Sequence, residues 1–385
     1  MLGIFKFSSF IQLLMLLLAL NVTSVIATQS PHITKIKSKV YGVDREIMVS
    51  LPSGYHQDKD KIYPVIYLTD AQMHIPHAAP MIQFLAGGIS ELIVVGVQTF
   101  DRQNELSPYR EDGREFSKHQ GAEQLLKFIE TEVKPHINST YRTAPFEILS
   151  GHSLGGLFTM FTFTRYPDSF DAYFALSPTL AYANFSILSE LEAKLSRVPK
   201  NKILVAYSEQ ETPFENQYKA FNQFLMLLKA QAPDWLDSQA RFISGEDHMT
   251  IAHLGLYHGL RHTFRDWWLF SNAMVGAPEK FDAHYKRLST RLGYEVIPEF
   301  NELWALTAYL IREQHYDEAH YLIKKWQSYY PNQSAPHYEL AQLYIAQNDP
   351  HRAVESVSLA IEFAKPNSRQ YRRSKDLQQA IKNKL

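Results

Sequence analysis

The chain has no cysteine among its 385 residues. A disulfide framework and a cysteine-linked lipid anchor are therefore excluded. An excess of charge of either sign is lacking too, because 39 Lys and Arg stand against 40 Asp and Glu. This balance gives no electrostatic reason to expect nucleic acid or an acidic membrane surface as a partner, so we expect a small-molecule substrate.

Long apolar runs are also missing at the N-terminus, where a membrane anchor would need roughly 20 apolar residues. Residues 1–27 carry one charge, Lys6, and an apolar core that spans only residues 10–20. Val25 and Ala27 match the pattern of a signal-peptidase site. We predict a cleaved signal peptide over 1–27, export to a periplasm or secretion, and no stable membrane span in the mature chain. An uncleaved membrane anchor is the alternative.

After residue 27, short β-type runs alternate with helical ones. The continuous apolar runs 63–69 and 92–98 are typical of buried parallel strands, whereas 121–133 has helical spacing. Further β-type runs lie within 33–52 and at 146–149, 171–177, 202–207 and 240–243, and we expect further helices near 214–230 and 250–272. The alternation predicts a doubly wound, mostly parallel α/β sheet over 28–277, with the active site at the carboxyl ends of the strands.

The region 278–385 contains no further β-type run, and we expect it to be all-helical. Its segments 316–319 and 350–353 share a pattern and lie 34 residues apart. Leu306 and Leu340 are separated by the same interval. This period resembles two tetratricopeptide repeats. Two such repeats are too few to be stable alone and must pack on something. They are either an appendage docked on the first region or a surface for a protein partner or a second copy of the chain.

Ser153 lies in Gly151-His152-Ser153-Leu154-Gly155, between a β-type run and a helical run. This Gly-x-Ser-x-Gly setting predicts a nucleophile elbow, a strained strand-to-helix turn that exposes the serine hydroxyl. The glycines leave room for the crowded backbone. The pattern alone is weak, but its position between strand and helix favours a catalytic serine.

A serine nucleophile needs a base, normally a histidine, and the chain has 16 histidines. In this fold the partners follow in the order serine, acid, histidine, each at the carboxyl end of a strand. His248 follows the last predicted strand, so we predict it as the base. The acid should follow the preceding strand, where Glu209 is our first choice and Glu211 the competitor. A Ser-His pair without an acid is the third possibility.

The oxyanion formed during ester cleavage needs backbone N–H donors. One donor is expected from the residue after the nucleophile, Leu154. The second should come from a loop at 70–73, where we choose the Gln72 amide because the chain can fold back there over the elbow. This chemistry requires no metal and no cofactor.

Residues 33 to about 272 resemble the putative-esterase family of α/β-hydrolases. The similarity is carried by 63–71, 102–108, the elbow with 166–178, and 245–249, in this order. The family includes siderophore, feruloyl and acetyl-xylan esterases, S-formylglutathione hydrolases and mycolyltransferases. The stretch 283–294 is similar to siderophore-esterase-like hydrolases that carry C-terminal repeats.

By position, the resemblance implies Glu209 as the acid, with alanine in place of the family's glycine three residues earlier. The family's oxyanion loop falls on 68–72, also with alanine replacing a glycine, and implies the Gln72 amide. Its arginine near the site falls on Arg102, which would bind a substrate carboxylate or phenolate, or else form a structural salt bridge. Trilactone siderophore esterases tend to carry tryptophan where this chain has 179–183, so a bulky catecholate substrate is not supported.

The leading hypothesis is an exported serine esterase that cleaves carboxylic esters through an acyl-enzyme on Ser153. An acyltransferase would use the same acyl-enzyme but release it to an alcohol. A non-catalytic hydrolase-fold scaffold that recruits a partner through its repeats is the third hypothesis. It is disfavoured because a scaffold has no physical need for Ser153, His248 and Glu209 together.

Overall fold

The computed structural model describes residues 31–56, 59, 61–110, 114–116, 120–269 and 271–383, so the predicted signal peptide 1–27 lies outside the described residues. Its centre is an eight-stranded sheet with the order β1-β2-β4-β3-β5-β6-β7-β8. The strands are β1 (His32–Lys37), β2 (Asp44–Ser50), β3 (Tyr63–Thr69), β4 (Ile93–Val97), β5 (Thr143–His152), β6 (Ala172–Leu176), β7 (Ile203–Glu209) and β8 (Asp237–Ile243). From β4 to β8 all neighbours pair in parallel, which confirms the predicted fold class.

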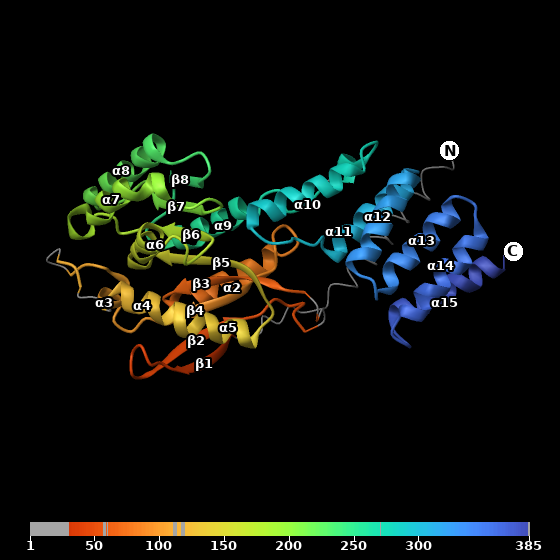
Figure 1. Cartoon of the computed structure of the whole chain (residues 1–385), viewed down its shortest axis with the longest axis horizontal. Helices are drawn as coiled ribbons and strands as arrows, with labels where there is room; N and C mark the ends of the chain where they lie inside the picture. The colour runs from red at the N-terminus through yellow and green to blue at the C-terminus, as the bar shows by residue number, and fades with distance from the viewer. Residues whose placement is uncertain are drawn as a thin grey trace, which may run out of the picture.

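Helices cover both faces of this sheet (Figure 1). They are α2 (Ala71–Leu85), α3 (Arg102–Leu106), α4 (Ala122–Phe128), α5 (Lys134–Thr140), α6 (Leu154–Arg165), α7 (Tyr182–Lys194), α8 (Glu215–Gln231) and α9 (Thr250–Thr263). Successive side chains of a strand point to opposite faces. In β3, accordingly, Val65 and Tyr67 pack with α4, α6, α7 and α8, whereas Ile66 and Leu68 pack with α2 and α9.

Most predicted elements are present, but the prediction of a loop at 70–73 was wrong. Asp70 alone forms the turn, with a left-handed φ of 53°, and α2 begins at Ala71. The prolines at positions 76 and 80 hide this helix in the sequence, because a proline removes a helical hydrogen bond. Both prolines lie on the exposed side of α2, where water can bind the freed carbonyl groups.

The C-terminal region is all-helical, as predicted, and extends away from the sheet (Figure 1). It consists of the short helix η3 (Ser271–Met274) and of α10 (Glu279–Leu292), α11 (Phe300–Arg312), α12 (Tyr316–Tyr329), α13 (Ser334–Ala346), α14 (Pro350–Phe363) and α15 (Arg369–Lys382). The α13–α14 pair begins and ends 34 residues after the α11–α12 pair. Among the residues described, no helix is both long and apolar enough to cross a membrane.

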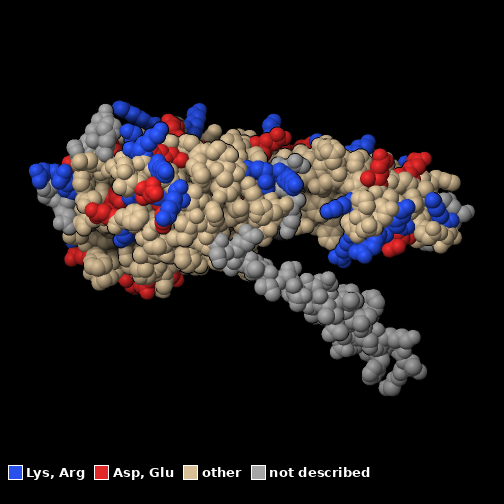
Figure 2. Space-filling model, turned by 90° about the horizontal axis from the view of Figure 1, so that it is seen from below, with Lys and Arg blue, Asp and Glu red and all other residues tan. Residues whose placement is uncertain are grey.

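The helical region joins the sheet through a shared core. Phe281 of α10, Leu306 of α11 and Leu322 of α12 belong to the same buried cluster as Ile66 and Leu68 of the sheet. Helices α13 to α15 share a smaller cluster, and Leu343 of α13 also belongs to the large one. On the face drawn in Figure 2, acidic and basic side chains are interspersed over the sheet-containing part, in keeping with the balanced composition.

Candidate active site

Ser153 occupies a sharp turn between β5 and α6. Its backbone has φ 60° and ψ −117°, a conformation that costs an L-residue energy and persists only where the surroundings enforce it. A Cβ on Gly151 would lie 2.0 Å from the main-chain oxygen of Gly155, and a Cβ on Gly155 would lie 2.3 Å from Thr69 Oγ1. Both glycines are therefore required by close packing, as a nucleophile elbow demands.

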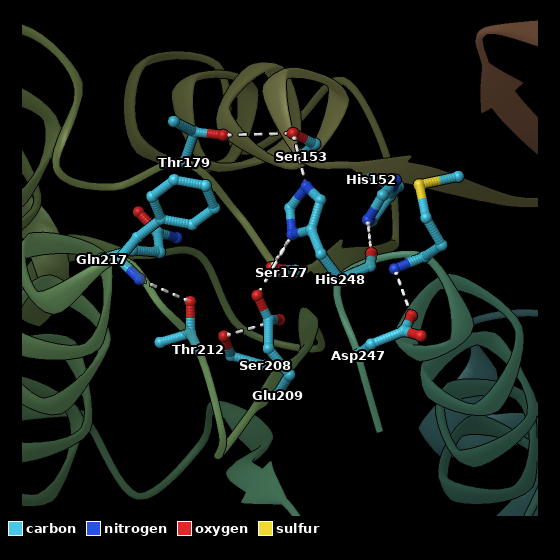
Figure 3. Close-up of polar contacts among 12 residues, drawn as sticks. His152, Ser153, Ser177, Thr179, Ser208, Glu209, Thr212, Gln217, Asp247 and His248 are labelled. Carbon is cyan, nitrogen blue, oxygen red and sulfur yellow. Dashed lines mark hydrogen bonds and ion pairs between the residues drawn. The ribbon is translucent and has the colours of Figure 1, made fainter. Parts of the chain in front are cut away.

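His248 lies between β8 and α9, and its imidazole connects the serine to a carboxylate (Figure 3). His248 Nε2 lies 3.1 Å from Ser153 Oγ, and His248 Nδ1 lies 3.1 Å from Glu209 Oε1. With the ring proton on Nδ1, the free Nε2 can take the serine proton. The structure thus brings together the three residues that chain order selected.

Of the two candidate acids, only Glu209 faces the imidazole. Glu209 ends β7 and is 1% exposed, whereas the exposed Glu211 accepts a hydrogen bond from the main-chain N–H of Gly245 at 3.1 Å. Burial alone would raise the pKa of the Glu209 carboxyl. Hydrogen bonds from His248 and Ser177 outweigh burial and hold this pKa below its ordinary value, so the carboxylate is ionised at neutral pH.

Ser177 was missed by sequence reasoning. Its buried hydroxyl lies 3.0 Å from His248 Nδ1, and it also bonds to the Glu209 carboxylate. The residue directly follows β6 at the carboxyl edge of the sheet, so the strand-end rule that selected Glu209 could have selected it. The nearby Thr179 Oγ1 lies 3.5 Å from Ser153 Oγ, at the outer limit of a hydrogen bond.

Four further histidines contact one another in a row that starts at the elbow. The ring of His152 is tilted against that of His248 and perpendicular to that of His74, with ring centroids 4.7 and 5.6 Å away. His74 Nδ1 lies 3.1 Å from His77 Nε2, and His77 Nδ1 lies 3.1 Å from His253 Nδ1. Even so, within the described part of the chain no three His, Asp or Glu side chains are arranged to hold a metal ion.

The two predicted oxyanion donors each lie in the first turn of a helix. Leu154 is the first residue of α6 and Gln72 is the second of α2, positions whose amides have no acceptor within the helix. The close approach of Gly155 to Thr69 shows that the start of α6 packs on the end of β3, immediately before α2. Both helix N-termini therefore lie near the serine and favour developing negative charge.

Arg102 forms the structural salt bridge that was one of its two predicted roles. Its Nε donates to Asp70 Oδ1 at 2.8 Å, and its Nη2 donates to Asp70 Oδ2 at 3.0 Å. Thr99 donates to the same carboxylate. Since the Asp70 side chain is fully buried, this bidentate pair compensates its charge and fixes the turn that precedes Gln72.

Comparison with known proteins shows the family of this chain. A family model described as "Putative esterase" matches residues 38–268, which is more than half of the chain. The chain belongs to this family. It is a carboxylic ester hydrolase.

Relatives of this esterase include the ferri-bacillibactin esterase BesA of Bacillus subtilis, which is 28% identical over 52% of this chain and 78% of its own. A crystal structure of an IroE-like serine hydrolase from Shewanella oneidensis is 28% identical, covers 78% of this chain and 99% of its own, and has a TM-score of 0.69. An uncharacterised protein from Capnocytophaga ochracea covers 92% of this chain and 99% of its own at 16% identity and a TM-score of 0.66. At that identity the likeness shows the fold alone.

Proposed function

We propose that this esterase is an exported serine hydrolase that works through an acyl-enzyme on Ser153. The observation that carries the proposal is the continuous hydrogen-bonded row from Ser153 Oγ through His248 to Glu209, with both contacts at 3.1 Å. Nucleophile, base and orienting acid are the parts that acyl transfer at a serine requires.

In the proposed reaction, Ser153 Oγ attacks the ester carbonyl while His248 Nε2 takes its proton. The oxyanion accepts hydrogen bonds from the amides of Leu154 and Gln72. The carbon–oxygen bond to the alcohol then breaks, and the alcohol leaves with the proton from His248. Water repeats the sequence on the acyl-enzyme and releases the carboxylic acid. Throughout, Glu209 holds Nδ1–H and stabilises the imidazolium.

For the substrate class we propose siderophore-type esters. Two relatives are named as siderophore esterases, of ferri-bacillibactin and of triacetylfusarinine C. The segment 179–183 lacks the tryptophan of trilactone esterases, so we expect its partly buried side chains to shape a pocket of different selectivity. Arg102 is proposed to act through the turn at Asp70 rather than by binding substrate directly.

A fluorophosphonate probe tests the catalytic proposal on the mature protein. We expect stoichiometric labelling that is lost in Ser153→Ala, together with hydrolysis of a hydroxamate or catecholate siderophore ester by the parent alone. Ser139→Ala, at an exposed position on α5 outside the site, serves as the matched control for intact folding. Equal labelling of parent and Ser153→Ala would contradict the proposal. Labelling without hydrolysis of either siderophore class would overturn only the substrate class.

Two further proposals concern processing and organisation. Residues 1–27 are proposed to be a cleaved signal peptide, so deleting them should leave the protein in the cytoplasm, whereas the full chain should reach the periplasm or the medium in shortened form. Cytoplasmic retention of the full chain would contradict this.

The mature chain is proposed to divide at 277–278, with α11–α14 as two tetratricopeptide-like units, since their helices recur at a 34-residue interval.

A further inference from the structure

A cavity of about 450 Å³ lies where the sheet meets the C-terminal helices. Its walls come from residues 61–62 before β3, from 294–299 between α10 and α11, and from 329–333 at the end of α12. The cavity thus adjoins the start of β3, whereas Ser153 follows the end of the parallel neighbour β5. The two places lie at opposite edges of the sheet, so this cavity is separate from the catalytic site.

The cavity wall is aromatic and holds a donor and an acceptor that lack partners. Tyr294, Tyr329 and Tyr330 line it together with Trp267. Trp267 is 5% exposed, and its buried indole N–H has no hydrogen-bond partner among the residues described. The same holds for the buried side-chain oxygen of Gln333. Buried polar groups are normally paired. Neither atom has accessible surface, so a ligand in the cavity meets them only after the two side chains rotate toward it.

The charges of the cavity favour a cation. Lys61 Nζ lies 2.7 Å from Glu91 Oε2 and 2.6 Å from Glu299 Oε2, so two carboxylates enclose its single positive charge. Glu295 adds a further, exposed carboxylate to the lining. Among the described residues that line the cavity, one lysine stands against two glutamates, which disfavours anionic ligands, and aromatic faces attract organic ammonium groups.

Apolar side chains contribute to the exposed part of the cavity lining, together with the polar Glu295 and Asn332. Ile62 and Ile297 line the cavity and are 47% and 46% exposed. A ligand with an apolar ring would remove both side chains from water. The location at the boundary between two structural regions is one that ligand sites prefer.

We propose that this cavity is a second ligand site, which binds a small aromatic amine that carries an oxygen acceptor. The ring would lie among the four aromatic side chains, and the ammonium group would lie near Glu295 and the Gln333 oxygen. The oxygen acceptor of the ligand would accept a hydrogen bond from the indole N–H of Trp267. A bound amine bridges the sheet region and the helical region, so its binding raises the thermal stability of the chain.

Titration calorimetry on the mature protein tests the site with tyramine, which has a ring, an ammonium group and a hydroxyl. The controls are 4-hydroxyphenylacetate, which replaces the cation by an anion, and phenethylamine, which lacks the hydroxyl. We expect tyramine to bind about tenfold more tightly than 4-hydroxyphenylacetate, a difference that corresponds to a single favourable charge contact. Labelling Ser153 with fluorophosphonate should leave this binding unchanged.

Three variants assign the binding to the cavity. Trp267→Phe should weaken tyramine binding more than phenethylamine binding, so that the two amines bind the variant with similar affinity. The exposed Glu295→Gln, which does not disturb the core, should weaken both amines severalfold. Glu355→Gln on α14, also exposed and outside the cavity lining, should change neither. Equal affinity for the amine and the carboxylate, the absence of tyramine binding at millimolar concentration, or indifference to Glu295→Gln would each overturn the proposal.

Discussion

His152 Nε2 lies 2.6 Å from the main-chain oxygen of His248. Burial, with His248 and His74 nearby, lowers the pKa of His152 to about 3, so its ring is uncharged at neutral pH. The ring proton must then be on Nε2, where it donates to the carbonyl group. The residue before the proposed nucleophile therefore fixes the backbone of the proposed base, while the nucleophile itself contacts the base's side chain.

Replacing His152 by Phe should slow catalysis without weakening substrate binding. The variant keeps a ring under the elbow but loses the N–H that orients the His248 backbone. We expect kcat to fall roughly 10-fold to 100-fold, as small misplacements of catalytic groups do, with KM little changed. Ester hydrolysis kinetics measure this split. The matched control is His253→Phe, at the exposed end of the histidine row, and a fall of equal size in the control would contradict the positioning role.

Glu209→Gln and Glu211→Gln should separate the two candidate acids. Gln at 209 cannot stabilise the imidazolium and can favour the wrong ring tautomer, so we expect kcat to fall by about 10² to 10⁴. Gln at 211 keeps an oxygen for the N–H of Gly245 and should leave kcat within about twofold, since surface substitutions are nearly neutral. Steady-state measurement of kcat for both variants on one ester decides between the two acids. Similar losses in both variants would refute the assignment of Glu209.

Gly151→Ala should disrupt the elbow and the fold around it. The added Cβ would meet the main-chain oxygen of Gly155 at 2.0 Å, and backbone cannot move aside as a side chain can. We expect a loss of about 3 kcal/mol or more in the free energy of unfolding, measured by urea denaturation. Gly42→Ala is the control, because its φ of 72° is strained but no atom lies within 4 Å of a new Cβ. That variant should lose only about 1 kcal/mol. Gly151 itself has no positive φ, so equal losses would contradict the cost expected from the close contact.

Glu302 should make stability fall as the pH rises. It is fully buried on α11, where burial raises the pKa of its carboxyl to about 7 despite hydrogen bonds from Tyr285 and the Leu269 amide. Between its ordinary pKa and about 7, the folded state holds a proton that the unfolded state has released. Stability from this group is therefore full at low pH and is lost by about pH 7, a decrease of about 3 kcal/mol.

Glu302→Gln should abolish this part of the pH dependence, because the amide is never ionised and still offers an oxygen to the Leu269 N–H. Urea unfolding of parent and variant at several values between pH 4.5 and 8 measures the difference. As the pH rises, the free energy of unfolding of the variant should increase relative to that of the parent. The exposed Glu355→Gln should follow the parent. Parallel curves for parent and Glu302→Gln would mean that the carboxyl ionises normally in the folded state.

The sequence predicted the alternation of strands and helices and the residues that meet at the carboxyl edge of the sheet. Ser153, Glu209 and His248 each follow a β-type run, and parallel strands must bring such residues to one edge, so chain order alone predicted their proximity. Their catalytic roles stay predictions. The choice between Glu209 and Glu211 depended on side-chain direction, which two positions so close in sequence do not reveal.

Other contacts could not be predicted because they depend on packing across the sheet. The contact from His152 to the His248 backbone joins residues far apart in sequence, and no local pattern marks it. Helix α2 was missed for a different reason. Pro76 and Pro80 lower helix propensity, and only the observed exposure of that side of the helix explains why they are tolerated.

The core that contains both Ile66 of the sheet and Leu306 of α11 has a consequence for how this protein can change. If the sheet region or the helices α10 to α12 were replaced by a counterpart from another protein, apolar surface would be exposed to water. The two regions must therefore be inherited as a pair. Substitutions in α10 to α12 are constrained by the volume of side chains on the sheet. Helices α14 and α15, which contribute to the smaller cluster and not to this core, are freer to diverge, lengthen or be lost.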